Sequence, residues 1–207
     1  DRTAMKEILK KATERGQKAL SEFDSKRLIA MAGFPVSRND LARSRNEAVA
    51  IAKKLGFPVV LKGCSDILTH KTEMGMVKLK LKTEVEVAEA YDEITGKGVD
   101  LDGVLVQEWI EGDKREFVVG LTRDPQFGPC VMFGLGGIFT EALNDVVFRV
   151  APVDEREAEA MIDELRSRKL LGPFRGEQAA QKAGIIRTLT GLSRIGLELP
   201  DDPLEGR

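Results

Sequence analysis

Apolar residues recur every three to four positions in several segments of the chain, a spacing that predicts amphipathic α-helices. Four of these segments begin with Ser, Thr or Asp, followed three residues later by an acidic residue, which is typical of a capped helix N-terminus. Their first residues are Ser21, Ser44, Thr83 and Asp154. We expect a last helix from about Glu177 to Leu197.

Short runs of apolar and β-branched residues lie between these segments and predict strands. They cover residues 58–62, 75–81, 103–110, 115–121, 130–135 and 146–152. In the second run, Val77, Leu79 and Leu81 alternate with lysines, which predicts a sheet with one face toward solvent. The strands form groups broken by helices, without a regular alternation of strand and helix, so we predict an α+β fold.

The segment IEGDKRE, residues 110–116, is polar and carries a glycine between two predicted strands, which favours a hinge between two lobes. We place an N-terminal helical extension at residues 1–19 and one two-lobed domain at 20–207. Within that domain, the first lobe covers about 35–107, the hinge about 108–114 and the second lobe about 115–199.

Composition narrows the class of protein. Of the 207 residues, 42% are hydrophobic and 32% are charged, which is typical of a folded globular chain. The net charge of −2 does not favour binding to nucleic acid or to an anionic membrane. The sequence has no apolar run of about 20 residues and no signal-peptide core at its N-terminus, so we expect a cytoplasmic protein.

Several residue types in the chain can bind phosphate or a metal. Lys62 ends an apolar strand and precedes Gly63, so its ammonium either reaches an anion or is simply solvated. Lys26 on the first capped helix is a second such cation. The run GLGGIFTE, residues 134–141, has glycines whose N–H groups can approach an anion, although a tight turn would also explain them. The carboxylates of Glu141 and Asp145 can hold Mg²⁺ together with substrate phosphates, or they are ordinary surface acids.

Other candidates lie near the hinge and in a polar loop. Glu108 and Glu116 flank the hinge and can accept hydrogen bonds from a ribose or an adenine amino group. Arg149 lies in an apolar strand and must be paired or functional if it points inward. His70 is the single histidine of the chain and has polar neighbours, so it is either a surface residue or an exposed nucleophile or general base.

Three stretches resemble the ATP-grasp domain of NDP-forming acyl-CoA synthetases, which include ADP-forming acetate–CoA ligase and enzymes similar to succinyl-CoA synthetase. These stretches are FPVVLKGCSDILTHKTEMGMVKLKL, VLVQEWIEGDKREFVVGLTRDPQFGPCVMFGLGGIFTEALNDVVFRVAP and LLGPFRG. The resemblance extends from about Leu20 to about Leu197. It implies an ATP-grasp fold, in which two α+β lobes clamp a nucleotide, with ATP or ADP and Mg²⁺ as ligands.

The resemblance also implies roles for individual residues. His70 would be the catalytic phosphoryl carrier on an exposed loop. Nucleotide-binding residues would be Lys26, Lys62, Gly63, Glu108, Trp109, Ile110, Glu116, Gly136 and Gly137. The metal ligands would be Glu141 and Asp145. The family usually continues into a strand that supplies an asparagine and a carboxylate to the metal site, whereas this sequence ends in GLELPDDPLEGR, so we expect a truncated C-terminal strand.

The function implied is the nucleotide-binding, phosphoryl-transfer part of an enzyme that converts a carboxylate, CoA and ATP into acyl-CoA, ADP and phosphate. Its partners would be the CoA-binding and ligase domains or subunit of the same synthetase, and the domain alone would not make acyl-CoA. Two alternatives stay open. One is a non-catalytic ATP-binding regulatory module of a larger protein such as an acetyltransferase, and the other is an ATP-grasp ligase that joins a carboxylate to an amine. The sequence decides neither the acyl group nor ATP against GTP.

Overall fold

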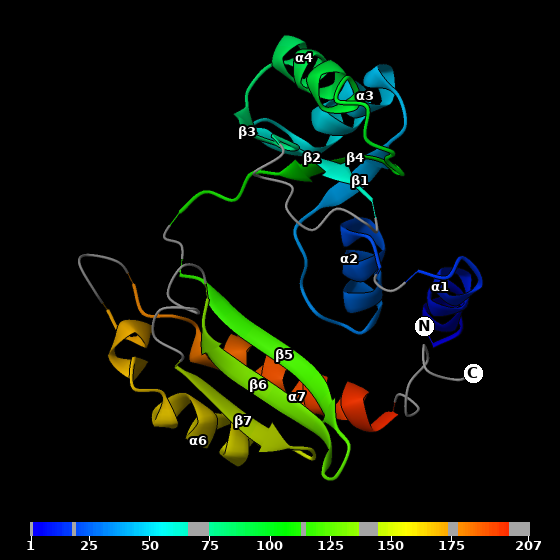
Figure 1. The fold of residues 1–207 in the computed structure, drawn as a ribbon. Coiled ribbons are helices and arrows are strands. Elements are labelled where there is room, and N and C mark those ends of the chain that lie inside the picture. The colour runs from blue at the N-terminus through cyan, green and yellow to red at the C-terminus, as the bar shows by residue number, and fades with distance from the viewer. Residues whose placement is uncertain are drawn as a thin grey trace. The chain divides into compact units, whose positions relative to one another are not determined.

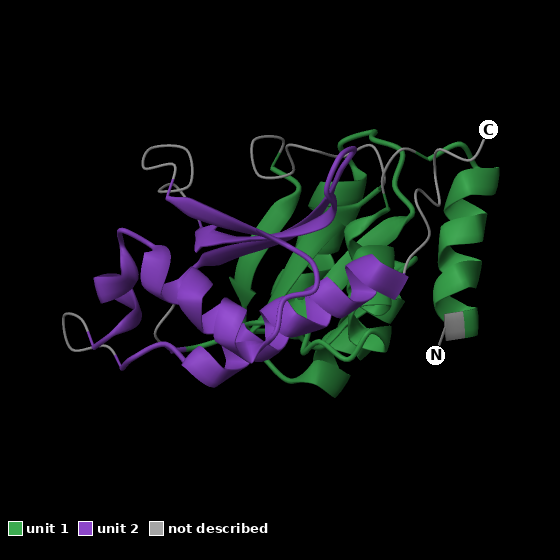
Figure 2. Ribbon diagram, turned by 90° about the horizontal axis from the view of Figure 1, so that it is seen from below, with its two compact units in different colours: residues 1–111 green, residues 112–207 purple. Residues whose placement is uncertain are grey.

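The computed structural model describes residues 2–17, 20–65, 75–112, 115–136, 145–173 and 178–198. The chain divides into two compact units, residues 1–111 and 112–207 (Figure 2). Each unit combines helices with an antiparallel sheet. The α+β class predicted from the sequence is therefore confirmed. No helix among the described residues is both long and apolar enough to cross a membrane.

Unit 1 is built on a sheet with the strand order β1-β4-β2-β3. These strands are β1 (Asn39–Ala42), β2 (Val59–Cys64), β3 (Val77–Leu81) and β4 (Gly103–Glu108). One face of the sheet is covered by α3 (Arg45–Leu55) and α4 (Glu84–Thr95), and α2 (Glu22–Met31) lies on the other side (Figure 1). The first helix, α1 (Arg2–Glu14), packs against α2.

The core of unit 1 decides which side chains of the sheet point toward α2. Val59 and Leu61 of β2 are fully buried against α3 and α4, together with apolar residues of those helices. Because successive residues of a strand point to opposite faces, Val60 and Lys62 point to the other side of the sheet. The pattern of β2 therefore places the Lys62 side chain on the same side as α2.

Strand β3 departs from its predicted alternation. Lys80 has a positive φ of 56°, and the pairing of β2 with β3 shifts register between Val59 and Leu61. Leu79 is consequently 59% exposed, so the prediction that Leu79 shares a buried face with Leu81 is wrong. A bulge of this kind disturbs the pleat, and sequence alternation alone does not reveal it.

Unit 2 is built on a sheet with the strand order β5-β6-β7. Its strands are β5 (Phe117–Asp124), β6 (Gly128–Leu135) and β7 (Val146–Val150). One face is covered by α6 (Glu155–Glu164) and α7 (Lys182–Glu198), and the short 3₁₀ helix η1 (Arg168–Leu171) follows α6 (Figure 1). Phe133 of β6, Met161 of α6 and Leu189 of α7 form the centre of this core.

The four predicted helix N-termini have the expected caps. Ser21, Ser44 and Thr83 each accept a hydrogen bond at 3.2 Å from the backbone N–H three residues later, and Asp154 does so at 2.8 Å. The last helix begins at Lys182 rather than near Glu177, which lies outside the described residues. The predicted truncated strand at the C-terminus lies outside them as well.

Candidate functional site

Two lysines from different elements of unit 1 meet at one carboxylate oxygen. The ammonium of Lys62 in β2 lies 2.8 Å from Oε1 of Glu22, and the ammonium of Lys26 in α2 lies 3.1 Å from the same atom. The sequence suggested both lysines as phosphate ligands but gave no sign that they are neighbours. The structure brings them together.

Polar side chains complete this group, which we call the lysine cluster: Glu22, Lys26, Ser37, Lys62 and Gln107. The Lys26 ammonium donates to the side-chain oxygen of Gln107 in β4 and, at 3.4 Å, to the Ser37 hydroxyl. The three charged side chains are only 19–24% exposed. Charges at this depth are screened less by solvent than fully exposed ones, so the cluster's net charge of +1 can attract an anion.

Local sequence explains how the cluster forms. Glu22 is the first residue of α2, directly after its cap Ser21, and a carboxylate there interacts favourably with the helix dipole. Lys26 follows four residues later on the same face of the helix, in the more favourable order for an ion pair. Lys62 arrives from β2 because strand alternation turns it toward α2. The sequence analysis did not select Glu22 or Gln107 as site residues. The spacing of Glu22, four residues before Lys26, is the one sequence signal that indicates an ion pair here.

Gly63 follows Lys62 and packs against the core. Its N–H donates to the Met76 carbonyl at 2.8 Å, and a Cβ at this position would lie 3.2 Å from the Met76 sulfur. A side chain here would force Met76 to move. Close packing against Met76 is therefore enough to explain why residue 63 is a glycine. The predicted role of Gly63 in nucleotide binding stays a prediction.

Glu108 at the end of β4 is held by Arg38. Its Oε1 accepts the Arg38 backbone N–H at 2.7 Å and its Oε2 accepts Nε of the same residue at 2.6 Å. These two hydrogen bonds, with the positive charge of the guanidinium, lower the pKa of Glu108 despite partial burial. The pair ties the chain just before β1 to the end of β4, and contact of Glu108 with a nucleotide stays a prediction.

Of the two residues after Glu108, Trp109 is half-buried and Ile110 is exposed. The backbone N–H of Trp109 donates to the Pro58 carbonyl at 3.1 Å. The Lys80 ammonium lies 5.7 Å from the centre of the Trp109 ring, within the range of a cation–π interaction. Ile110 is 52% exposed. Their predicted contacts with a nucleotide stay predictions.

In unit 2, Gly136 and Glu116 meet through their backbones. The Gly136 N–H donates to the Glu116 carbonyl at 2.8 Å, and a Cβ on Gly136 would lie 3.0 Å from backbone atoms of Glu116 and Phe117. Only glycine allows this approach without a shift of the backbone. Gly137 lies outside the described residues, and the nucleotide roles of all three residues stay predictions.

Asp145 is buried and bound to the turn after α6. Its carboxylate accepts the Arg166 N–H at 3.0 Å, the Ser167 N–H at 2.8 Å and the Ser167 hydroxyl. Burial alone would raise the pKa of Asp145, but the hydrogen bonds from Ser167 and Arg166 together bring it below the ordinary value.

The predicted Mg²⁺ site is not completed by residues that the structure describes. Glu141 lies outside them, and Asp145 directs its oxygens to backbone and hydroxyl donors. Within the described ranges, no three His, Cys, Asp or Glu side chains gather where they could hold a metal ion. Mg²⁺ commonly takes only one or two carboxylates together with substrate phosphates. The assignment of Glu141 and Asp145 therefore stays a prediction.

Two further candidates have different outcomes. His70 belongs to residues 66–74, outside the described residues, so the structure does not test its role. Arg149 is paired: its Nε lies 3.1 Å from Glu157, and its Nη2 contacts Glu164, both on α6. These contacts explain an arginine on the helix-covered face of β7 and give it a structural role.

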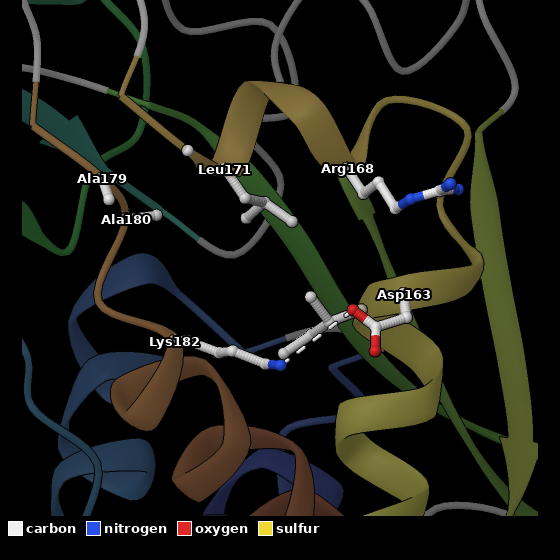
Figure 3. A pocket seen from close by; sticks show the side chains of 8 residues that line it. Asp163, Arg168, Leu171, Ala179, Ala180 and Lys182 are labelled. Carbon is white, nitrogen blue, oxygen red and sulfur yellow. Dashed lines mark ion pairs between the residues drawn. The ribbon is translucent and has the colours of Figure 1, made fainter.

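Unit 2 also has a pocket of about 300 Å³ between α6, η1 and the start of α7 (Figure 3). Arg168 and the ion pair of Asp163 with Lys182, at 4.0 Å, supply its charges, and Leu171 supplies apolar surface. None of the residues predicted for the site lines this pocket. We therefore centre the candidate site on the lysine cluster.

Comparisons with known proteins agree on one family. A family model described as an ATP-grasp domain matches residues 11–201. The chain is 38% identical to the β subunit of ADP-forming acetate–CoA ligase I from Pyrococcus furiosus, over 97% of this chain and 89% of that protein. It is 37% identical to ADP-forming acetate–CoA ligase I from Archaeoglobus fulgidus, over 97% of this chain but only 30% of that protein.

A solved structure has the same fold over nearly the whole chain. It is dinucleotide-forming acetyl-coenzyme A synthetase 1 from Candidatus Korarchaeum cryptofilum, with a TM-score of 0.85 and 43% identity. The match covers 95% of this chain and 87% of that one. That structure contains coenzyme A and Mg-AMPPCP, and its phosphohistidine segment points towards its nucleotide binding site.

Proposed function

The chain belongs to the ATP-grasp domain family, and from this premise we propose that it is the nucleotide-binding, phosphoryl-transfer part of an ADP-forming acyl-CoA synthetase. The complete enzyme would convert a carboxylate, CoA and ATP into acyl-CoA, ADP and phosphate. The observation that carries the proposal is the meeting of Lys26 and Lys62 in the lysine cluster. Two neighbouring ammonium groups can neutralise part of the negative charge of a polyphosphate chain.

The chemistry of phosphoryl transfer explains why two lysines matter. The reaction depends mainly on positioning the phosphates and neutralising their charge. The Lys26 and Lys62 ammonium groups can each donate charge-assisted hydrogen bonds to phosphate oxygens. Because both side chains are mostly buried, their positions are restricted before the nucleotide arrives. When Mg²⁺ is bound, it would neutralise further charge on the phosphates.

In the proposed step, a neutral imidazole nitrogen of His70 attacks the terminal phosphorus of ATP. The nitrogen–phosphorus bond forms as the bond from phosphorus to the bridging oxygen breaks, and ADP leaves with that electron pair. The phosphoryl group then passes to the ligase part of the synthetase, which regenerates the free imidazole. Imidazole suits this role because it is partly unprotonated near neutral pH.

The remaining partners follow from the same proposal. The CoA-binding and ligase parts would belong to separate domains or to another subunit, where the carboxylate and CoA bind. Glu141 and Asp145 would supply oxygen ligands to Mg²⁺, and Glu108, Trp109, Ile110 and Glu116 would contact the nucleoside. The roles of Gly63, Gly136 and Gly137 would be to let phosphates approach the backbone.

The test is labelling with ATP that carries a radioactive terminal phosphate, in the presence of Mg²⁺. We expect an acid-labile, base-stable label that maps to His70 and disappears in His70→Ala. A matched control is Lys78→Met, which removes a lysine that pairs with Glu93 outside the cluster and should leave labelling unchanged. Nucleotide binding without any label would contradict the transfer step and favour the binding-only regulatory module.

A further inference from the structure

The Glu22 carboxylate lies between Lys26 and Lys62, the two lysines of the proposed phosphate site. A single atom, Oε1, lies 2.8 Å from one ammonium and 3.1 Å from the other. Two ammonium groups that share one oxygen are themselves close enough to repel each other, and the carboxylate offsets this repulsion. Glu22 is thus the counter-ion of the pair.

A carboxylate oxygen and a phosphate oxygen make the same kind of contact with an ammonium group. Both are anionic acceptors, and both form short charge-assisted hydrogen bonds. If a phosphate took these lysines while Glu22 stayed in place, two anions would lie side by side in a site with limited access to solvent. Like charges at that separation disfavour each other, so the two acceptors must compete.

The contacts of Glu22 exceed those of an ordinary helix ion pair. Its pairing with Lys26 alone would be a local interaction between residues four apart on α2. Lys62 joins the same oxygen from β2, 40 residues further along the chain. The carboxylate therefore lies at the point where two elements of unit 1 direct their positive charge.

We propose that Glu22 is an internal counter-ion that competes with nucleotide phosphates for Lys26 and Lys62 and releases them when the nucleotide binds. This inference rests on the proposed function. Its consequence is that Glu22 lowers the affinity of the site, because part of the binding energy of the phosphates is used to displace the carboxylate. A lower affinity favours release of ADP after phosphoryl transfer.

The test compares Glu22→Gln with Asp24→Asn in the full chain. Both substitutions remove one negative charge from the first turn of α2, but Asp24 pairs with Arg27 and not with the cluster. Isothermal titration with ADP, and separately with inorganic tripolyphosphate, reports the affinity for the whole nucleotide and for its phosphates alone. We expect Glu22→Gln to bind both probes about fivefold more tightly. Asp24→Asn should match the wild type.

The outcomes separate this inference from the proposed function. If the wild type binds ADP and Glu22→Gln binds it equally or more weakly, Glu22 is not a competitor and only this inference fails. Weaker binding would make Glu22 a positioning residue for the lysines. If neither protein binds either probe, the proposed function fails together with the inference.

A measurement on the wild type guards against misfolding of the variant. The carboxyl carbon of Glu22 can be followed by NMR in labelled protein during titration with tripolyphosphate. We expect its chemical shift to move toward that of a solvated carboxylate as the probe saturates the site. An unchanged shift at saturation would overturn the inference.

Discussion

Each unit holds a carboxylate surrounded by hydrogen-bond donors, but the donors differ in kind. Glu22 in unit 1 faces two lysine ammonium groups at the ends of long side chains. Asp145 in unit 2 faces the backbone N–H groups of Arg166 and Ser167 and the Ser167 hydroxyl. Glu22 is partly exposed, whereas Asp145 is buried.

The difference indicates which carboxylate can be replaced by a ligand. Lysine side chains can change partners by rotating about their own bonds, so another anion can take the place of Glu22. Backbone N–H groups cannot turn away without altering the turn that carries them, so Asp145 is part of the framework. Glu22 is therefore the carboxylate that a ligand could displace, whereas the hydrogen bonds of Asp145 hold the turn after α6.

Among substitutions that test the difference between Glu22 and Asp145, we expect Lys62→Met to have the largest effect, on the rate of phosphoryl labelling. Loss of one of the two cations proposed to bind phosphate should lower the rate of phosphoryl labelling about 100-fold, a magnitude typical of removing one preorganised charged donor. Circular dichroism should show the fold unchanged, because the lysine is a side chain of a polar cluster and not of the core. A fall in the labelling rate of less than about threefold would contradict the proposed phosphate-binding role of Lys62, because even an exposed charge pair can contribute that much.

Asp145→Asn is expected to lower the free energy of unfolding by about 2 kcal/mol, because it puts an amide group against buried N–H donors. Guanidinium denaturation measures this, and Asp163→Asn is the matched control. Asp163 is 71% exposed and forms a long ion pair with Lys182, so its loss should cost about 0.5 kcal/mol or less. Unchanged stability of Asp145→Asn with a higher Mg²⁺ requirement for labelling would instead favour the predicted metal role.

The rigidity of unit 2 is tested by Gly196→Ala on α7. The added Cβ would lie 2.8 Å from Leu121 and 2.9 Å from Pro129, so the helix would have to move away from the sheet. We expect a loss of about 1.5 kcal/mol in unfolding free energy. Gly184→Ala on the same helix has no neighbour closer than 3.9 Å and should be neutral or stabilising by up to about 1 kcal/mol. Equal effects at both positions would contradict close packing at Gly196.

The smallest effect that we expect is a change in the free energy of unfolding with pH, caused by the titration of Asp145. Its pKa is lower in the folded chain, so the ionised carboxylate stabilises the fold above the unfolded pKa of about 3.9, and this contribution is lost as the pH falls through the folded pKa. The difference in unfolding free energy between the wild type and Asp145→Asn should shrink by about 1 kcal/mol between about pH 6 and about pH 3. A constant difference would mean that Asp145 does not titrate with unfolding.

Much of the fold could be predicted because its signals are local. Ser44 with Glu47 and Thr83 with Glu86 identify helix starts within four residues of sequence, and both caps are present in the structure. The resemblance to acyl-CoA synthetases and the α+β class are confirmed. Strand β1 was not predicted, because its four residues, NDLA, have no strand preference of their own. Pairing with β4 makes it a strand, and that pairing joins residues more than 60 positions apart in the sequence.

The candidate site was predicted in parts and not as an arrangement. Lys26 and Lys62 were selected one at a time, from position on a helix and at a strand end. Glu22 was missed because an acidic residue in the first turn of a helix is sufficiently explained by the helix itself. Its second partner, Lys62, reaches it only when β2 folds against α2, and Gln107 joins from β4 in the same way. Contacts between distant segments leave no pattern in a single sequence.

The helix caps have a consequence for how this protein can hold an anion. A helix start attracts phosphate through N–H groups that have no partner, yet α2, α3, α4 and α6 each use a cap from their own sequence and carry acidic residues in the first turn. At these four helix starts the cap occupies one N–H group and the acidic residues repel an anion, which makes them poorer sites for a polyanion. If the lysine cluster binds the nucleotide phosphates as proposed, acylating Lys26 or Lys62 would remove a cation from that site and leave these helices intact.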